Sequence, residues 1–287
     1  MAVILDSTAK VVAVAATGPY GRNQIKFMQA AGTDIVGVVA LGRGGESLLE
    51  LPIFDNVQAA VEATDANTAI IYAPALGVRS AIVECADAGL RLAVAAAEFV
   101  PLHDALYAAA YAHERKMHLV GPNTVGMATP GQAMLGAVTP SFTRPGRLGI
   151  IARSGTLTLA IARLLSESGF GQSTLVHVGG DVIAGTNPDE WLKLFDKDDD
   201  TSAVIFLGEI GGSKEYALAK SVNSANKPVA SLIVGRHAPA EKRMGHAGAL
   251  VGSGRETASA KQDALREAGA IVCGSPAALV EFAKAYA

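Results

Sequence analysis

Cysteine, aromatic residues and charged residues are all scarce in this chain of 287 residues. The two cysteines, Cys85 and Cys273, lie far apart in apolar segments, which excludes a disulfide-rich secreted domain and is typical of reduced core thiols. Aromatic residues make up 5% of the sequence and charged residues 18%, and the formal net charge is −3. That balance provides no global basic field, so neither nucleic acid nor an anionic membrane surface is an expected partner.

Long apolar runs are missing as well. The N-terminus has no basic segment followed by an apolar one, as a signal peptide would have. No apolar stretch approaches the roughly 20 residues that a helix needs to cross a bilayer. We therefore expect a cytoplasmic protein of bacterial type that has no membrane segment.

Two groups of catalytic signatures are also absent. The sequence contains no H-x-x-x-H, C-x-x-C or H-E-x-x-H spacing, so we expect no metal site on this chain. It contains no G-x-S-x-G either, which argues against a Ser/His/Asp hydrolase.

What the sequence does contain is a regular alternation of short β-branched runs and longer helical patterns, with hydrophobic residues at 50% of positions. The expected strands are 10–16, 34–40, 68–73, 90–97, 116–121, 147–152, 173–179, 201–208, 227–235 and 269–274. The expected helices are 20–31, further stretches between the early strands, 156–168, 188–196, 213–224, 255–268 and 276–286. This order predicts an α/β fold with parallel, doubly wound sheets.

Residues 122–146 interrupt the alternation. The segment holds four prolines and four glycines and no periodic run. We therefore predict one α/β domain over 1–125, a connecting segment over 126–146 and a second α/β domain over 147–287, with about five strands in each domain.

The segment VVAVAATGPYGRNQIKF predicts a strand, a turn of small residues and the start of a helix. Thr17, Gly18 and Gly21 stand where a dinucleotide-binding fold holds a pyrophosphate, because glycines let backbone N–H groups approach the phosphate at a helix N-terminus. The spacing departs from G-x-G-x-x-G, so a tight turn with no ligand explains it equally well.

The second strand ends without the carboxylate of an NAD site. Such a site places Asp or Glu there to bind the ribose hydroxyls. Here the strand runs into LGRGGE, and the guanidinium of Arg43 suits a phosphate on the ribose. The pattern indicates NADP or coenzyme A, with an ordinary surface arginine as the alternative.

Further candidates follow strands of the second domain. Ser154, Gly155 and Thr156 in ARSGTLT would open a helix whose free N–H groups suit an anion, with a simple helix cap as the alternative. In LGEIGGS, Glu209 would end a buried strand at the edge where ligands of parallel sheets bind. A role as a cap of the next helix is the alternative for Glu209.

His246 stands in the glycine-rich segment RMGHAGALVGSG. Imidazole is a good nucleophile toward phosphoryl groups at neutral pH, and a carboxylate on its other ring nitrogen would orient it. Because this segment also follows a strand, we expect Ser154, Glu209 and His246 to converge at one rim. We expect the other histidines to be structural or at the surface: His103, His113, His118, His177 and His237.

Together, RMGHAGALVGSGRETASAKQDALREAG, RSGTLT, GFGQST, GGD, LGEIGGS and GPN…G…TPG resemble the α subunits of succinate–CoA ligase along essentially the whole chain. The resemblance implies a Rossmann-type CoA-binding domain followed by a flavodoxin-like ligase domain. It also implies a partner β subunit with an ATP-grasp site for ATP or GTP and Mg²⁺, in an αβ or α2β2 assembly. The implied reaction is carboxylate + CoA + NTP ⇌ acyl-CoA + NDP + phosphate, through an acyl phosphate and a phosphohistidine.

The resemblance assigns roles to residues at matching positions. His246 is implied to be phosphorylated, Glu209 to orient it, and the helix opened by Ser154, Gly155 and Thr156 to hold the phosphate. The implied CoA contacts are Thr17, Gly18, Pro19, Tyr20, Arg43, Ala96, Ala97 and Glu98. Arg43 replaces the usual lysine, and Ala97 lacks the hydroxyl of the usual threonine.

Two departures concern the acid. Leu159 stands where the family has a tyrosine that contributes to carboxylate binding, and Thr124 stands where a cysteine usually lies near the CoA thiol. The acid therefore remains open among succinate, malate, citrate and a sulfur analogue of succinate. A non-catalytic CoA-sensing module and an NADP-dependent dehydrogenase are the alternatives of other classes.

Overall fold

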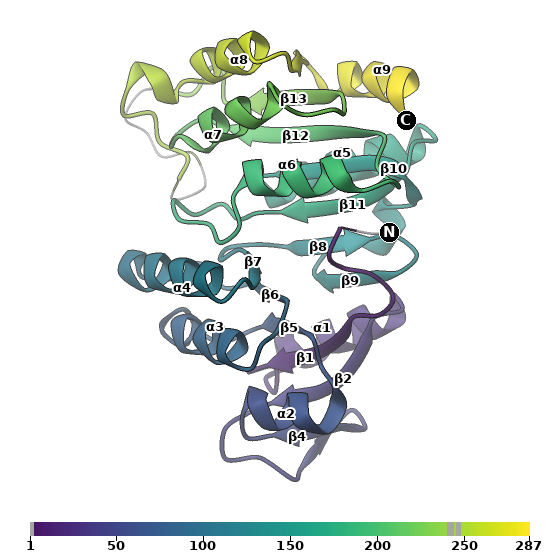
Figure 1. Ribbon diagram of the computed structural model, residues 1–287, viewed down its shortest axis with the longest axis vertical. Coiled ribbons are helices and arrows are strands. Elements are labelled where there is room, and N and C mark those ends of the chain that lie inside the picture. Colours follow the sequence, from purple (N-terminus) through teal and green to yellow (C-terminus); the bar gives the residue numbers. More distant parts are fainter. Residues whose placement is uncertain (1–2, 240–243, 245–247) are drawn as a thin grey trace. The chain divides into compact units, whose positions relative to one another are not determined.

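The computed structural model describes residues 3–239, 244 and 248–287, and the chain divides into two compact units (Figure 1). The N-terminal unit comprises Ile4–Val138 and Ile183–Thr186. The C-terminal unit comprises Met1–Val3, Thr139–Val182 and Asn187–Ala287. Each unit has strands with helices packed against them, so the predicted α/β class is confirmed.

The N-terminal unit has a mostly parallel sheet with the strand order β3-β4-β2-β1-β5-β6-β7. Its strands are β1 (Lys10–Val14), β2 (Asp34–Val39), β3 (Ser47–Leu48), β4 (Leu51–Phe54), β5 (Thr68–Ile71), β6 (Leu92–Ala95) and β7 (His118–Val120). β3 pairs with β4 in the antiparallel direction, and the other neighbours are parallel. Without β3, the remaining strands are arranged 3-2-1-4-5-6 in chain order, which is the Rossmann strand order. The predicted Rossmann-type domain is therefore confirmed.

Helices of the N-terminal unit lie beside this sheet (Figure 1). They are α1 (Pro19–Ala30), α2 (Val57–Thr64), α3 (Val78–Asp87) and α4 (Leu102–Glu114), with a short 3-10 turn at Ala75–Gly77. α4 buries Ala105, Ala108 and Ala112, whose spacing of three and four residues puts them on one face of the helix. Such small side chains let α4 pack closely against β7 and α3.

The parallel strands of the C-terminal unit follow the order β14-β13-β12-β10-β11. They are β10 (Pro145–Ala152), β11 (Gln172–His177), β12 (Ala203–Glu209), β13 (Val229–Val234) and β14 (Ile271–Val272). When these five strands are numbered 1 to 5 in chain order, starting at β10, the sheet reads 2-1-3-4-5 from β11 to β14. This is the arrangement of flavodoxin-like folds, as expected. The direction of winding reverses at β10, so β10 and β12 flank the point where such folds bind ligands.

Helices follow the strands of the C-terminal unit in turn. They are α5 (Gly155–Glu167), α6 (Pro188–Lys197), α7 (Lys214–Val222), α8 (Ala258–Glu267) and α9 (Pro276–Tyr286), with 3-10 turns at Pro140–Phe142 and Gly254–Glu256. Right-handed crossovers put α6, α7 and α8 on one face and α5 with α9 on the other. In the described part of the chain, no helix is long and apolar enough to cross a membrane.

The first part of the segment expected to connect the domains forms a buried hairpin. β8 (Gly126–Thr129) and β9 (Ala133–Gly136) pair in the antiparallel direction, and all their residues are buried. A Cβ on Gly126 would lie 1.8 Å from the Leu135 carbonyl oxygen, so the glycines that suggested a linker allow two backbones to touch. The division of the chain falls after Val138, within the segment that was expected to connect the domains.

The core of the C-terminal unit depends on one close contact between β10 and α6. Trp191 and Phe195 of α6 are fully buried. Gly149 of β10 faces Phe195, and a Cβ at this glycine would lie 2.6 Å from the ring. The glycine therefore leaves the space that the aromatic ring fills.

Gly149→Ala tests this packing. The added methyl group meets a fully buried ring, so we expect the free energy of unfolding in urea to fall by about 1–3 kcal/mol. Gly274→Ala is the matched control, because a Cβ there meets nothing within 4 Å and the change should stay within about 0.5 kcal/mol. Equal losses in the two variants would contradict the proposed packing.

Candidate functional site

The carboxyl ends of β10 and β12 bring two predicted site residues together. Ser154 follows β10, and Glu209 is the last residue of β12, the neighbouring parallel strand. Arg153, between β10 and Ser154, places Nη2 3.7 Å from Oε1 of Glu209. The side chains of Arg153 and Glu209 are only 1% and 7% exposed, so this charge pair is shielded from water.

The N-terminus of α5 is capped by Ser154. The Ser154 hydroxyl accepts a hydrogen bond from Leu157 N at 3.4 Å, and its carbonyl accepts one from Thr158 N at 2.9 Å. The N–H groups of Gly155 and Thr156, in the same first turn, have no acceptor inside the helix. No acidic side chain lies in that turn. The capping interpretation of Ser154 is therefore correct, and the free donors at positions 155 and 156 suit an anion.

A buried ionic cluster fixes the end of β12. We define it as Arg153, Glu209, Glu215 and Lys261. Glu215 accepts from Arg153 Nη1 at 2.6 Å through Oε1 and from Lys261 Nζ at 2.6 Å through Oε2. The side chains of Glu215 and Lys261 are both 0% exposed, so their charges are satisfied only by one another and by neighbouring polar groups.

The cations of this cluster also bind the main chain after Glu209. Lys261 Nζ donates to the carbonyl oxygens of Glu209 at 2.9 Å and Gly211 at 2.5 Å, and Arg153 Nη1 donates to that of Gly211 at 3.0 Å. Burial lowers the pKa of Lys261, while the charge of Glu215 acts in the opposite direction. The turn that carries Glu209 is thus held from β10 and α8.

Gly211 makes room for another segment of this edge. Its φ is +81°, and a Cβ there would lie 2.0 Å from the carbonyl oxygen of Gly248. Residues 248–250 therefore pass directly over the turn after Glu209. A larger residue at position 211 would displace them.

A hollow of about 400 Å³ opens beside Glu209. It is lined by Glu209, Ile210, Val234, Gly235, Arg236, His237, Ala238, Met244 and Ala249. His246 lies outside the described residues, but Met244 and Ala249 on either side of it line this hollow. Arg236 and His237 are exposed at the same place, and sequence reasoning had set His237 aside as structural or surface.

The predicted CoA turn lies at the winding reversal of the other sheet. Thr17, Gly18, Pro19 and Tyr20 follow β1, and Tyr72 follows β5, the strand beside it. α1 begins at Pro19 with Gly18 as its N-cap, and no side chain caps it. The backbone donors of this first turn therefore suit a phosphate, as predicted from the sequence.

Tyr72 was not among the site residues predicted from the sequence, but its hydroxyl group could contact a ligand bound at this turn. Its ring packs edge-on against Tyr20, with centroids 5.7 Å apart. Its hydroxyl oxygen is buried and, among the described residues, has no hydrogen-bond partner. Burial raises the pKa of this phenol, so it stays a protonated donor. A buried donor with no protein acceptor fits a polar ligand such as CoA.

Arg43 lies in the loop after β2, the other neighbour of β1. Its guanidinium holds the Glu46 carboxylate at 2.5 Å from Nη2 and 3.1 Å from Nε. This hydrogen bond raises the pKa of Arg43 and lowers that of Glu46. Arg43 is thus an exposed cation held in place by its neighbour.

The remaining predicted site residues lie partly in the N-terminal unit and partly in the C-terminal unit. Ala96 and Ala97 are half-buried and Glu98 is exposed at the end of β6. Thr124 is buried, and its hydroxyl accepts from Gly126 N at 2.8 Å, so it stabilises the turn before β8. Leu159 is half-buried on α5 of the C-terminal unit.

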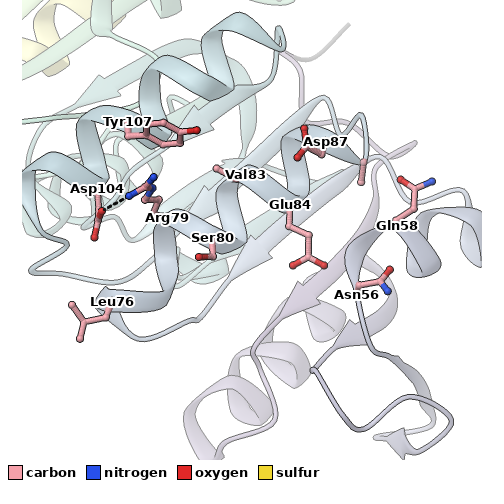
Figure 2. A pocket seen from close by; sticks show the side chains of 11 residues that line it. Asn56, Gln58, Leu76, Arg79, Ser80, Val83, Glu84, Asp87, Asp104 and Tyr107 are labelled. Atoms are coloured by element: carbon pink, nitrogen blue, oxygen red, sulfur yellow. Dashed lines mark hydrogen bonds and ion pairs between the residues drawn. The ribbon is translucent and has the colours of Figure 1, made fainter.

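A groove of about 750 Å³ lies on the α2–α4 side of the N-terminal unit (Figure 2). Arg79 crosses it with an ion pair to Asp104 at 3.2 Å and packs over the Tyr107 ring at 4.1 Å. None of the predicted site residues lines this groove. Its charged lining consists of one basic side chain, Arg79, and three acidic ones, Glu84, Asp87 and Asp104.

Comparisons with known proteins identify both units. The CoA-binding domain family matches residues 6–99, and the CoA-ligase family matches residues 151–271. The chain is 42% identical over 281 residues to subunit alpha 2 of an ADP-forming succinate–CoA ligase of Archaeoglobus fulgidus, covering 98% of each protein. It is 40% identical to the corresponding alpha subunit of Aquifex aeolicus, covering 98% of this chain and 93% of the relative.

Solved structures show the same fold. The ATP citrate lyase of Methanosaeta concilii in complex with (3S)-citryl-CoA superposes with a TM-score of 0.88 at 25% identity over 98% of this chain. This chain spans 50% of that longer one. A dinucleotide-forming acetyl-CoA synthetase of Ca. Korarchaeum cryptofilum has a TM-score of 0.78 at 21% identity, which shows the fold alone. With full-length relatives at 42% identity and both domain families matched, the chain belongs to the α subunits of the succinate–CoA ligase family, which are CoA-binding ligases.

Proposed function

We propose that this chain works with a β subunit, which carries an ATP-grasp nucleotide site and Mg²⁺, to join a small carboxylic acid to CoA. The reaction is carboxylate + CoA + NTP ⇌ acyl-CoA + NDP + phosphate. The observation that carries the proposal is the shielded Glu209 next to the free donors of α5, at the winding reversal between β10 and β12. Full-length relatives named as succinate–CoA ligase α subunits support it.

We infer that His246 is the phosphoryl carrier. In the direction of acyl-CoA formation, its imidazole would attack the γ-phosphorus of NTP, and the bond between that phosphorus and the bridging oxygen would break, releasing NDP. The carboxylate then takes the phosphoryl group from the histidine, and the CoA thiol displaces phosphate from the resulting acyl phosphate. Glu209 would accept a hydrogen bond from the other ring nitrogen, and the N–H groups of Gly155 and Thr156 would hold the phosphoryl oxygens.

Labelling tests the phosphohistidine. After incubation of the chain and its β subunit with γ-labelled ATP, we expect acid-labile label on the wild type and none on His246→Asn. Glu209→Gln should slow labelling on the order of 10²-fold, because the ring is no longer oriented by a carboxylate. Undiminished label on His246→Asn, or no label on the wild type, would contradict the mechanism.

We propose that the CoA site is formed by residues 17–20, Arg43 and Ala96–Glu98, with Tyr72 as an additional donor. CoA supplies the thiol that takes up the acyl group. Thr17, Gly18 and Tyr20 offer backbone N–H donors to its phosphates, whereas Pro19 has none, and Arg43 offers a guanidinium to the phosphate on its ribose. When CoA binds, the Arg43 guanidinium must then release the Glu46 carboxylate, or hold both the carboxylate and the ribose phosphate.

Comparison of CoA with dephospho-CoA tests the role of Arg43. Arg43→Ala should raise the KM for CoA by roughly fivefold or more while leaving the KM for dephospho-CoA unchanged, because only CoA has the ribose phosphate. Arg79→Ala is a matched control, since Arg79 is also an exposed arginine paired with a carboxylate. If the two variants raise the KM for CoA equally, Arg43 has no specific role.

The acid is the least determined part of the proposal. We propose a small di- or tricarboxylic acid of the succinate, malate or citrate type, or a sulfur analogue of succinate. At position 159 the chain offers a half-buried leucine, which can neither donate nor accept a hydrogen bond. Succinate is therefore not favoured by this residue over the other acids.

A screen of carboxylates for ATP-dependent thioester formation identifies the acid. We expect an acid other than succinate to have the highest kcat/KM. Leu159→Tyr should raise kcat/KM for succinate relative to that acid by roughly tenfold, the value of one hydrogen bond to a charged group. A wild-type enzyme that prefers succinate by a wide margin, with no gain in the variant, would show that position 159 does not select the acid.

A further inference from the structure

Lys214 crosses the carboxyl end of β10 from one neighbouring strand to the other. It is the first residue of α7, after β12, and its Nζ donates to the carbonyl oxygen of Asp181 at 2.8 Å. Asp181 lies in the segment after β11. Because β10 lies between β11 and β12 in the sheet, this hydrogen bond passes over the strand end that leads into Ser154.

The segment after His246 touches the same place. A Cβ at Gly248 would lie 3.1 Å from the carbonyl oxygen of Gly180, 3.4 Å from Arg153 Nη2 and 3.6 Å from the carbonyl carbon of Asp181. Residue 248 therefore packs on the loop that holds the Lys214 ammonium. Lys214 is a neighbour both of the buried ionic cluster and of the segment that carries the proposed phosphoryl carrier.

Charged groups surround Lys214 from every side of this edge. They are Arg153 after β10, Asp181 after β11, Glu209 at the end of β12, Glu215 on α7 and Lys261 on α8, with Glu256 near Gly212 and with Arg236 and His237 at the hollow. The Glu256 carboxylate accepts hydrogen bonds from main-chain N–H groups, including Gly252 N at 2.8 Å. Burial and the charge of Arg153 lower the pKa of Lys214 to about 7, although Glu215, Glu209 and Asp181 oppose the shift.

The charges of the buried ionic cluster, Asp181 and Lys214 balance only when the Lys214 amine is protonated. Arg153, Lys214 and Lys261 then offset Asp181, Glu209 and Glu215. A neutral Lys214 leaves one excess negative charge at the edge where an anion has to bind. Since like charges repel strongly in a shielded site, a phosphoryl dianion would favour the protonated amine.

We propose that Lys214 compensates the charge of the phosphoryl group at this edge, and that its Nζ takes up one proton from solvent when the anion binds. This deepens the proposed function and rests on it, because it assumes that the phosphoryl group is held at the N-terminus of α5. Lys214 is a positioning and charge-compensating residue and forms no covalent bond. The proton is the only species that it exchanges.

The pH dependence follows from this exchange. Bound anion raises the pKa of Lys214 above its value of about 7 in the free protein. Below pH 7 the amine is protonated in both states, so anion affinity is at its highest. As the pH rises from 7 toward the raised pKa, binding requires proton uptake and the affinity falls by up to about tenfold per pH unit. Above the raised pKa the affinity is low and constant.

The experiment measures sulfate binding to the full chain as a function of pH. Sulfate is a dianion with phosphoryl geometry, and it does not itself titrate near neutrality. Calorimetry gives the affinity, and NMR of protein with ¹³C-labelled lysine follows the Lys214 titration with and without sulfate. The resonance is assigned by its loss in Lys214→Arg.

For the wild type we expect affinity that falls above pH 7 and a Lys214 titration that sulfate moves upward. Lys214→Arg keeps a fixed charge, so its affinity should be high and independent of pH across this range. Lys214→Met should bind weakly at every pH. Lys220→Met, an exposed lysine on the same helix, is the control and should behave as wild type.

The proposal is overturned if wild type and Lys214→Met show the same pH profile, or if sulfate leaves the Lys214 titration unchanged. Thermal unfolding of Lys214→Arg and Lys214→Met checks that both variants fold. Failure of the proposed function has a different signature, namely the absence of acid-labile label on wild-type His246. If wild-type His246 is labelled but wild type and Lys214→Met have identical pH profiles, the proposed role of Lys214 is refuted and the proposed function is not.

Discussion

Glu215 is the constraint on which the edge with the proposed catalytic residues depends. It is fully buried and accepts from both Arg153 and Lys261, so it ties the end of β10 to α7 and α8. A carboxylate removed from water is tolerated only when paired and hydrogen-bonded, and removing one member of such a network costs about 3–5 kcal/mol. The same two cations hold the carbonyl oxygens of Glu209 and Gly211. The main chain at Glu209 and Gly211 is therefore positioned by the same cations that satisfy Glu215.

Both units place their candidate ligand groups where the winding of a parallel sheet reverses. In the N-terminal unit this is between β1 and β5, where the turn at residues 17–20 meets Tyr72. In the C-terminal unit it is between β10 and β12, with α5 and Glu209. At such a point two helices leave on opposite faces, and a crevice opens between them. One geometric rule thus provides two anion sites in a chain whose net charge is slightly negative.

The sequence predicted the fold class and most of the candidate residues at the strand ends, because the signals for these features are local. Strand periodicity, glycine turns and the motif around Glu209 fixed the fold class and the residues at the strand ends. The buried ionic cluster escaped prediction because its ion pairs join residues that are 46 to 62 positions apart, and no pattern in the chain marks which charges will meet. The hairpin at 126–136 was not predicted, since glycines that allow backbone contact look the same in sequence as glycines that allow flexibility. The pairing of Arg43 with Glu46 was open to local reasoning, because three residues separate them.

Lys261 is the last member of the buried ionic cluster to be synthesised, so the cluster is completed late. A ribosome releases the chain from its N-terminus, so Arg153 and Glu215 emerge well before α8. Until Lys261 docks, the Glu215 carboxylate has one cation where two are needed, and the carbonyl oxygens of Glu209 and Gly211 have Arg153 but not Lys261 as a donor. The edge with the proposed catalytic residues is therefore completed by one of the last helices to be synthesised. A nascent or truncated chain can build its central strands while its proposed active site is still unformed.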